Sequence, residues 1–183
     1  MPEQVLFVCH ANLCRSPMAE HIARRLLARW PVAVASAGTA AVPGRPMHPY
    51  AAFVTATRGG DPTGFRSRRL DAADLVEATL VLTATRRQRS FCATLAPAVL
   101  RRTFTLRQFA RLAAAADPPS GGDGRPLRAV VEAAALARAR LQPALDGDDL
   151  ADPIGGGPAD FTRCAEEIER SVAPIGALIA AAG

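Results

Sequence analysis

Cys9 and Arg15 are the residues whose types and spacing most clearly indicate chemistry, because they enclose five residues in a Cys-x5-Arg pattern. The apolar run 5–8 precedes the cysteine, and Ser16-Pro17 follows the arginine. A short loop that opens a helix presents backbone N–H groups to an anion, and such a positive field favours a thiolate over a thiol. The guanidinium of an arginine can hold two phosphoryl oxygens at once. The pattern therefore predicts a loop that binds phosphate and attacks it with a cysteine thiolate.

A second Cys-x5-Arg match runs from Cys164 to Arg170, so the bare spacing is not specific. Its interior, Ala-Glu-Glu-Ile-Glu, carries three carboxylates that would repel phosphate, and we interpret it as part of a helix. The first match differs in its flanks, with a strand before it, small and polar residues inside it and Ser-Pro after it. The Gly-x4-Gly-Lys-Ser/Thr pattern of nucleotide-binding loops is missing from the sequence.

The segment 8–17 resembles the signature of the low-molecular-weight protein tyrosine phosphatases, particularly their bacterial members. The resemblance covers most of the chain, and it implies one phosphatase domain over residues 1–183 that hydrolyses phosphoproteins without a metal. Further matches follow in the family's order: Ser36-Ala37-Gly38-Thr39, Ser67-Arg68 with Leu70, Ala73-Asp74-Leu75 before the strand-like 79–82, and Asp152-Pro153 before Asp160-Phe161.

With this resemblance, Cys9 is expected to attack phosphorus and to form a phosphocysteine. Ser16 could donate its hydroxyl to the thiolate, or it could simply start the helix. Asn12 tolerates left-handed backbone geometry. In the family the matching Asn bonds the Ser that corresponds to Ser36, although Ser36 could equally be an ordinary loop residue. The equatorial oxygens are expected to bind Arg15 and the loop that contains it, namely His10, Ala11, Asn12, Leu13, Cys14, Arg15 and Ser16.

The leaving oxygen of a phosphate ester needs a proton, which a well-placed carboxylic acid supplies with a gain of about 100- to 10,000-fold. Asp152 is the candidate, because only this aspartate precedes the Pro of the family pattern. It would then act as the base for the water that frees the enzyme. Asp148 and Asp149 are nearby competitors, whereas we interpret Asp160 as the cap of the final helix.

Cys14 lies in the same loop as Cys9, and the resemblance implies that the two can close a reversible disulfide. A small packing residue is the alternative. His10, His21 and His48 lie far from any Cys-x2-Cys pair, so no zinc spacing is present. The sequence therefore predicts no metal and no cofactor.

Substrate choice depends on departures from the family. Tyrosine-specific members carry aromatic cleft residues at positions that fall here near Val42 and on Ile154-Gly155, and each lost stacking pair is worth about 0.5–1.5 kcal/mol. Phe65 replaces a family histidine. The segment 152–156 resembles bacterial members of the family, including the protein arginine phosphatase branch. That branch, however, carries a Thr where this chain has Leu13, and an aliphatic residue there resembles the tyrosine branch. We therefore expect phosphotyrosine hydrolysis, with protein arginine phosphatase activity as the alternative.

Two further classes remain as weaker alternatives. Thiol-dependent arsenate reductases share the loop but relay oxidation through two more cysteines after the third strand. Cys92 stands at the second of those positions and Thr85 at the first, so the relay is interrupted. A phosphopeptide-binding module without turnover is the other alternative, and the intact Cys9, Arg15 and Asp152 argue against it.

The chain has 183 residues, which suits one domain, and a net charge of +5 with arginine as its only basic residue apart from histidine. One Trp and one Tyr offer few stacking platforms for bases. We expect a solvated basic surface and a phosphorylated protein or an inorganic oxyanion as partner, not nucleic acid. The arginines cluster at 24–25, 66–69, 86–89 and 101–102.

The sequence also predicts a location. The first strand begins within a few residues of Met1, which leaves no room for a targeting segment, and no apolar run reaches the length of a bilayer span. A nucleophilic cysteine that must stay reduced indicates a reducing compartment. We therefore expect a cytoplasmic protein with no membrane partner.

The elements that must position these residues alternate between strands and helices. This alternation predicts an α/β single-domain, three-layer sandwich with a four-stranded parallel sheet flanked by helices, and with the Cys-x5-Arg phosphate loop after the first strand. Residues 117–145 are expected to form an inserted loop and helix beside the core. Strands are expected at 5–9, 32–37, 80–83 and 103–106, and helices from Pro17 to Pro31, at 49–58, at 127–141 and from 161 onward with a kink at Pro174.

Overall fold

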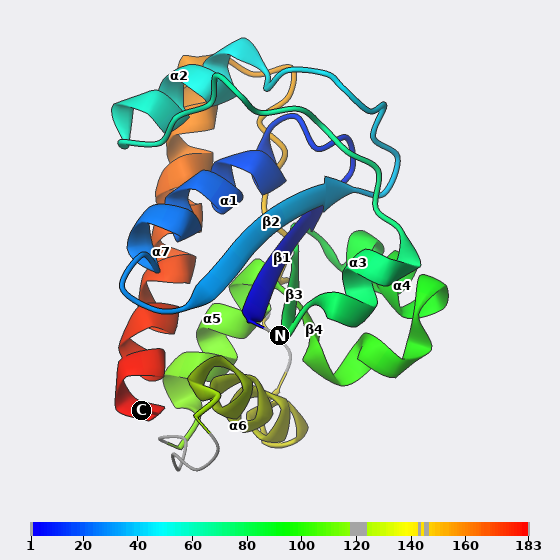
Figure 1. The fold of residues 1–183 in the computed structure, drawn as a ribbon, viewed down its shortest axis with the longest axis vertical. Coiled ribbons are helices and arrows are strands. Elements are labelled where there is room, and N and C mark those ends of the chain that lie inside the picture. Colours follow the sequence, from blue (N-terminus) through cyan, green and yellow to red (C-terminus); the bar gives the residue numbers. More distant parts are fainter. Residues whose placement is uncertain (1, 118–123, 143, 145–146, 183) are drawn as a thin grey trace.

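The computed structural model describes residues 2–117, 124–142, 144 and 147–182, and it contains one four-stranded sheet in the order β2-β1-β3-β4 (Figure 1). All three strand pairings are parallel. The predicted sheet is therefore confirmed, and each strand lies within two residues of its expected bounds. The strands are β1 (Glu3–Cys9), β2 (Val32–Gly38), β3 (Leu80–Thr83) and β4 (Thr103–Thr105).

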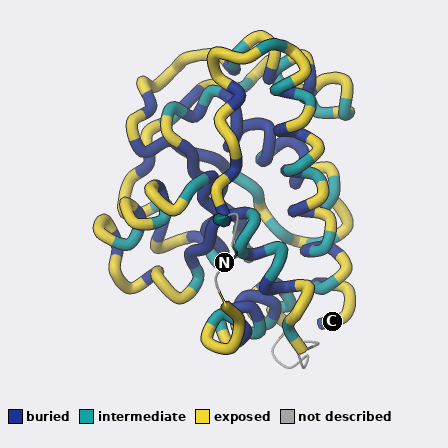
Figure 2. The backbone as a smooth tube through the Cα atoms, turned by 180° about the vertical axis from the view of Figure 1, so that it is seen from behind, coloured by how far each residue is buried: buried dark blue, intermediate teal, exposed yellow. Residues whose placement is uncertain are grey.

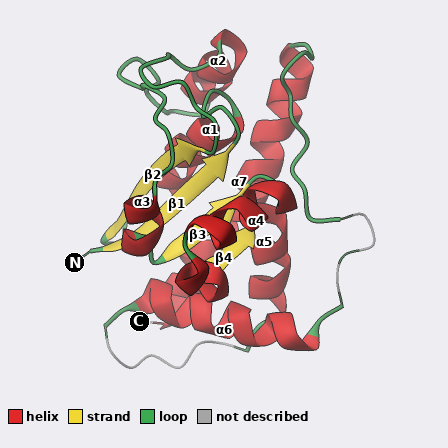
Figure 3. Ribbon diagram, turned by 90° about the vertical axis from the view of Figure 1, so that its right-hand side faces the viewer, coloured by secondary structure: helices red, strands yellow, loops and turns green. Residues whose placement is uncertain are grey.

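Helices cover both faces of the sheet, which makes the three layers (Figure 1 and Figure 3). One layer holds α1 (Arg15–Leu26), α5 (Leu106–Ala115), α6 (Pro126–Arg140) and α7 (Pro158–Ala182), and α2 (Pro49–Thr57) packs against α1 and α7. The other layer holds α3 (Ala72–Glu77), α4 (Arg86–Leu95) and the 3-10 helix η1 (Pro97–Arg102).

The sheet separates two buried apolar clusters, because successive side chains of a strand point to opposite faces. In β1, Val5 and Phe7 belong to the larger cluster, with α1, α5, α6 and α7. Leu6 and Val8 belong to the smaller cluster, with α3, α4 and η1. Figure 2 shows the buried backbone concentrated in the interior and exposed backbone around it.

Helix α1 ends earlier than its apolar spacing predicts. Met18 and Ile22 are buried as expected, but the last helical residue is Leu26, and residues 27–30 form turns. The chain must reverse here so that Val32 can pair with Glu3 at the start of the sheet. Leu27, rather than Leu26, supplies the last fully buried side chain of this face.

Helix α7 buries all six apolar positions predicted for it, from Phe161 to Ile179. The interpretation of Asp160 as the helix cap is wrong in its position. Pro158 occupies the first helical position, and Asp160 lies in the first turn, where its Oδ2 accepts a hydrogen bond of 2.8 Å from the N–H of Gly157. The helix continues beyond Pro174, and the kink there stays a prediction.

The helix expected at 127–141 is α6, which packs on α5 and α7 through buried residues such as Leu127 and Val130. Residues 118–123, 143 and 145–146 of the predicted insert lie outside the described residues. Among the helices of the described part, none is long and apolar enough to cross a membrane.

Arginines bind backbone carbonyls on both edge strands of the sheet. On β2, the carbonyl of Val34 accepts a hydrogen bond of 3.3 Å from Arg24. On β4, the carbonyl of Thr103 accepts bonds of 3.0 Å from both Arg89 and Arg138. Burial and, to a smaller extent, the nearby Arg89 charge together lower the pKa of Arg138 to about 10.

Candidate active site

The sheet topology places the Cys-x5-Arg loop at the expected ligand position. β1 and β3 are neighbours, but the helices that follow them, α1 and α4, lead to strands on opposite sides. The carboxyl end of the strands at such a switch point is where α/β sheets bind ligands. β1 ends at Cys9 and α1 begins at Arg15, so the loop lies at this end of the sheet. The first-turn N–H groups of a helix have no intrahelical partner.

Cys9 is 3% exposed, and its sulfur has two polar neighbours within the loop region. Ser16 Oγ lies 2.9 Å from Cys9 Sγ, and the N–H of Asn12 donates to the same sulfur at 3.3 Å. Ser16 Oγ also lies 3.3 Å from the carbonyl of Ala37, which can accept from it. The structure thus brings Ser16 to the candidate nucleophile, as the sequence predicts.

Asn12 holds the loop from inside. It is fully buried, and its φ of 55° lies in the left-handed region, which the sequence analysis anticipated for this residue. Its Nδ2 donates to Ser16 Oγ and to Ser36 Oγ, each at 2.9 Å, while its Oδ1 accepts from the N–H of Arg68 at 2.9 Å. The side chain therefore links the loop to β2 and to the segment before α3.

Arg15 and Asp152 are in direct contact. Arg15 Nη2 lies 2.5 Å from Asp152 Oδ2, and Nη1 donates to the carbonyl of Leu150 at 3.2 Å. The N–H of Leu150 in turn donates to the carbonyl of Ala84, just after β3, which fixes this segment at the carboxyl end of the sheet. The Asp152 side chain is 41% exposed, so it reaches both the guanidinium and solvent.

The competing aspartates have other partners. Asp148 is buried and pairs with Arg111 at 3.2 Å. Asp149 accepts a hydrogen bond of 2.8 Å from the N–H of Arg86 at the start of α4. Neither contacts Arg15 among the interactions of the described residues, so Asp152 is the aspartate that the structure brings to the loop.

All four cysteines are free thiols in this structure, so the disulfide between Cys9 and Cys14 stays a prediction. Cys14 precedes α1 and is buried. Its pKa is raised to about 12, mainly by burial and to a smaller extent by Asp152 and Cys9, while the Arg15 charge acts in the opposite direction. Cys92 is fully buried on α4, and Thr85 accepts from Gln88 as that helix's cap.

The Leu13 backbone is bonded to His48, which belongs to an aromatic cluster that the sequence analysis did not assign to the site. Leu13 is half-buried against the core, and its carbonyl accepts from the N–H of His48 at 2.9 Å. The His48 ring stacks on Phe161 at 4.7 Å, and Tyr50, which is 42% exposed, packs edge-on against Phe161. The expected aliphatic positions are exposed, as Ile154 illustrates at 53%.

Glu20 is a second residue that the sequence analysis missed. Its Oε2 accepts a hydrogen bond of 2.5 Å from Ser36 Oγ. The sequence could have indicated Glu20, because it follows Ser16 by four residues in the predicted helix and residues four apart share a helix face. The Arg68 N–H that holds Asn12 has no sequence signal, because every residue except proline carries this group.

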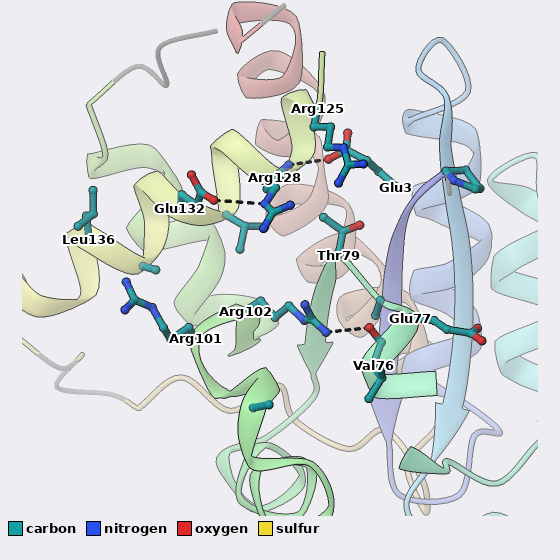
Figure 4. Close-up of a pocket in the computed structure, with 15 residues that line it drawn as sticks. Glu3, Val76, Glu77, Thr79, Arg101, Arg102, Arg125, Arg128, Glu132 and Leu136 are labelled. Carbon is teal, nitrogen blue, oxygen red and sulfur yellow. Dashed lines mark hydrogen bonds and ion pairs between the residues drawn. The ribbon is translucent and has the colours of Figure 1, made fainter. Parts of the chain in front are cut away.

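A cleft of about 780 Å³ lies at the amino end of the strands, at the opposite end of the sheet from the Cys-x5-Arg loop (Figure 4). Its walls include Glu3, Thr79, Arg102 and Arg128, and none of the predicted site residues. Arg102 donates to the carbonyl of Val76, and Arg128 pairs with Glu132 at 3.3 Å. Within the described ranges, no group of three or more His, Cys, Asp and Glu side chains could hold a metal ion.

The fold and the loop together define an α/β protein with a Cys-x5-Arg loop at the carboxyl end of a parallel sheet. A family model described as low molecular weight phosphotyrosine protein phosphatase matches residues 4–146. The chain belongs to this family.

Named relatives fall in two branches. The chain is 39% identical over 82 residues to a probable low molecular weight protein-tyrosine-phosphatase, EpsP, of Ralstonia solanacearum, a match that covers 45% of this chain and little more than half, 55%, of that relative. It is 33% identical over 167 residues to a protein-arginine-phosphatase of Geobacillus stearothermophilus, covering 91% of this chain and 88% of that one. The solved structure of the YwlE arginine phosphatase from the same organism has a TM-score of 0.71 at 28% identity and covers 96% of this chain and 92% of that chain.

Proposed function

We propose that the chain is a metal-independent phosphoprotein phosphatase that hydrolyses phosphotyrosine through a phosphocysteine intermediate. The observation that supports this most directly is the placement of the Cys9 sulfur, with Ser16 Oγ at 2.9 Å and the Asn12 N–H at 3.3 Å. Both groups can stabilise a thiolate, and the Arg15–Asp152 pair adds a cation and a carboxyl group to the same loop. The relatives named as phosphatases support the same chemistry.

In the first step the Cys9 thiolate attacks phosphorus, a P–S bond forms and the P–O bond to the leaving group breaks. Arg15 and the N–H groups of residues 10–16 hold the three remaining oxygens. Asp152 gives a proton to the leaving oxygen, then takes one from the water that breaks the P–S bond and releases inorganic phosphate. A phosphoryl group would compete with the Asp152 carboxylate for Arg15, which would leave the carboxyl free to take up its proton.

The test is a hydrolysis panel of phosphotyrosine, phosphoserine, phosphothreonine and phosphoarginine peptides with a metal chelator present. We expect turnover of phosphotyrosine by the wild-type chain, and none by Cys9→Ser. That variant should still bind orthovanadate, since Arg15 and the loop amides do the binding. Steady-state turnover by Cys9→Ser, or a requirement for a metal, would contradict the proposal.

Phosphoarginine is the second candidate, because the full-length relative and the solved structure named above are arginine phosphatases. Leu13 favours phosphotyrosine, since an aliphatic side chain offers no hydrogen bond to a guanidinium nitrogen and an unpaired polar group costs about 1–3 kcal/mol. We therefore predict that Leu13→Thr shifts the kcat/KM ratio toward phosphoarginine by about ten- to a hundredfold.

The ratio is measured on matched peptides, with Leu26→Thr, at a half-buried position outside the loop, as the control. An unchanged ratio, or a wild-type preference for phosphoarginine, would show that Leu13 is not the selector. Tyr50 and Ile154 would then be the next residues to replace. We also propose a cytoplasmic location, because the Cys9 thiol must stay reduced to act.

A further inference from the structure

A series of polar side chains connects the candidate nucleophile to Glu20 on α1. Cys9 Sγ lies 2.9 Å from Ser16 Oγ, and Asn12 Nδ2 donates both to Ser16 Oγ and to Ser36 Oγ at 2.9 Å. Ser36 Oγ then donates to Glu20 Oε2 at 2.5 Å. The series therefore runs from the phosphate loop through β2 and back to the helix that the loop opens.

The donors and acceptors in this series have one consistent direction. An ionised carboxylate only accepts, so the single proton of the Ser36 hydroxyl goes to Glu20. Ser36 Oγ can then only accept from Asn12, which agrees with the amide orientation that the Arg68 N–H requires at Asn12 Oδ1. The Asn12 side chain is thus held by two independent neighbours. One is Glu20, which acts through Ser36, and the other is the N–H of Arg68.

Ser36 depends on Glu20 because it is 3% exposed and its proton needs a buried acceptor. If the carboxylate were removed, the hydroxyl would rotate toward another acceptor, since a buried donor without a partner is destabilising. Its lone pair would then leave Asn12. Asn12 is the only non-glycine residue with a positive φ in the described part of the chain, and such a conformation persists only where its surroundings hold it.

Glu20 is itself held in place. Its side chain is 13% exposed, and its Oε1 accepts from Arg24, which also donates to the carbonyl of Val34 on β2. The pocket of about 360 Å³ that Glu20 and Ser36 line also contains the half-buried Phe65 and the polar side chains of His21, Asp61 and Arg68. Among the hydrogen bonds of the described residues, however, Ser36 Oγ is bonded to Glu20 and Asn12.

We propose that Glu20 is a positioning residue, which acts through Ser36 and Asn12 to keep the phosphate loop in the conformation that binds an oxyanion. The inference rests on the proposed function, because it assumes that the loop binds the phosphoryl group. Glu20 has no contact with the reacting atoms, so its effect must disappear when Ser36 can no longer transmit it.

The experiment is a double-mutant cycle read out by the dissociation constant of orthovanadate, an oxyanion whose binding requires no turnover. Glu20→Leu and Ser36→Ala are each expected to weaken binding by about three- to tenfold, corresponding to the loss of one hydrogen bond. The double variant is expected to bind orthovanadate no more weakly than whichever single variant binds it less tightly. Glu20→Gln keeps an acceptor oxygen and should stay within about twofold of wild type. All titrations are made below the unfolding transition of every variant.

Glu132→Leu is the matched control, because Glu132 also pairs with an arginine four residues away on a helix, far from the loop. It should bind orthovanadate as the wild type does. Wild-type affinity in Glu20→Leu, or an additive loss in the double variant, would overturn the inference and leave the proposed function standing. Failure of the wild-type chain to bind orthovanadate would overturn both.

Discussion

Asp152 is in contact with Arg15 and is also the proposed proton donor, and both roles depend on its position in the 150–154 segment. Its Oδ1 accepts from the N–H of Ile154 at 3.2 Å, which makes a local turn, while Oδ2 faces Arg15. Without a phosphoryl group in the loop, the carboxyl group is therefore oriented by its own backbone and by the guanidinium. When a phosphoryl group replaces it at Arg15, the bond from the Ile154 N–H still holds the carboxyl group beside the loop, where it can act as an acid on the leaving group.

We predict that Asp152→Ala slows substrates with poor leaving groups much more than activated ones. Phenyl phosphate should lose about 100- to 10,000-fold in kcat/KM, because a phenolate needs the proton that Asp152 supplies. Nitrophenyl phosphate should lose far less in kcat/KM, because its leaving group departs without one. The measurement is kcat/KM, which reports the step in which the leaving group departs and not the later hydrolysis of the phosphocysteine, against leaving-group basicity for a series of aryl phosphates. An equal loss for every substrate, or a larger loss from the control Asp149→Ala, would move the acid elsewhere.

Gly38, the last residue of β2, lies so close to the loop that no side chain fits there. A Cβ at this position would lie 2.6 Å from the His10 carbonyl and 2.8 Å from the Asn12 nitrogen, both backbone atoms. Gly38→Ala is therefore expected to displace the loop, to weaken orthovanadate binding at least about tenfold and to lower the free energy of unfolding by about 1–3 kcal/mol.

Binding titration and urea denaturation measure the two effects. Gly64→Ala is the control, because nothing lies within 4 Å of its added Cβ and its φ is not positive. If Gly38→Ala bound orthovanadate as tightly as wild type does, the loop would accommodate a Cβ at position 38, and the prediction would be wrong.

At the scale of single residues, contacts made by side chains of a characteristic type could be predicted from the sequence. Contacts made by backbone groups could not. The pairing of Ser16 with Cys9 followed from a motif, and the left-handed Asn12 followed from the known tolerance of asparagine for this conformation. The carbonyl of Leu150 and the N–H of Arg68 bind the site through backbone groups, which the sequence does not distinguish from any others. The position of Asp160 was misplaced because Pro158 can take the first helical position.

At the scale of elements, burial decides what the sequence reveals. The strands were predicted from their short apolar, β-branched runs, and β2 and α2 also have Pro31 or Pro49 before or at their starts and Gly38 or Gly59 at or after their ends. Helix α4 was not predicted, since it buries only Gln88 and Cys92 and so shows little apolar periodicity. Helix α3 has six residues and buries only Leu75. Both helices depend on their caps, Asp71 and Thr85, more than on a buried face.

Helix α3 begins with a reciprocal cap that also concerns the site. Asp71 accepts from the N–H of Asp74 at 2.8 Å, Asp74 accepts from the N–H of Asp71, and Arg68 pairs with Asp74 at 2.5 Å. We predict that Asp71→Ala lowers the free energy of unfolding by about 1 kcal/mol, as the loss of a helix cap does.

Urea denaturation measures this change. Glu77→Ala at the exposed end of the same helix is the control and should change stability by less than about 0.5 kcal/mol. A loss of similar size in both variants would mean that the cap contributes nothing specific.

For the whole molecule, three buried thiols link stability to pH. Burial raises the pKa of Cys14, Cys92 and Cys164 to about 12 from 9.0. Below pH 9 these thiols are protonated in both the folded and the unfolded chain. Between pH 9 and 12 the unfolded chain loses the protons that the folded chain keeps, so stability falls as pH rises.

We therefore predict that the free energy of unfolding decreases above pH 9, by up to about 1.4 kcal/mol per pH unit for each thiol. Urea denaturation at a series of pH values from 7 to about 10.5 measures the slope. Cys92→Val removes one thiol from a fully buried position and should make the slope shallower, whatever its effect on stability at pH 7. A slope that is the same in both chains would contradict the assignment for Cys92.

The arginines on β2 and β4 have a consequence for how copies of this chain meet. An edge strand with free carbonyls can extend into a second molecule, which is the usual start of sheet aggregation. Here Arg24 binds the carbonyl of Val34, and Arg89 and Arg138 bind that of Thr103, so each edge carries a bulky charged group where a neighbouring strand would dock. These arginine side chains therefore oppose the docking of a further strand at Val34 and at Thr103, at the two edges of the four-stranded sheet.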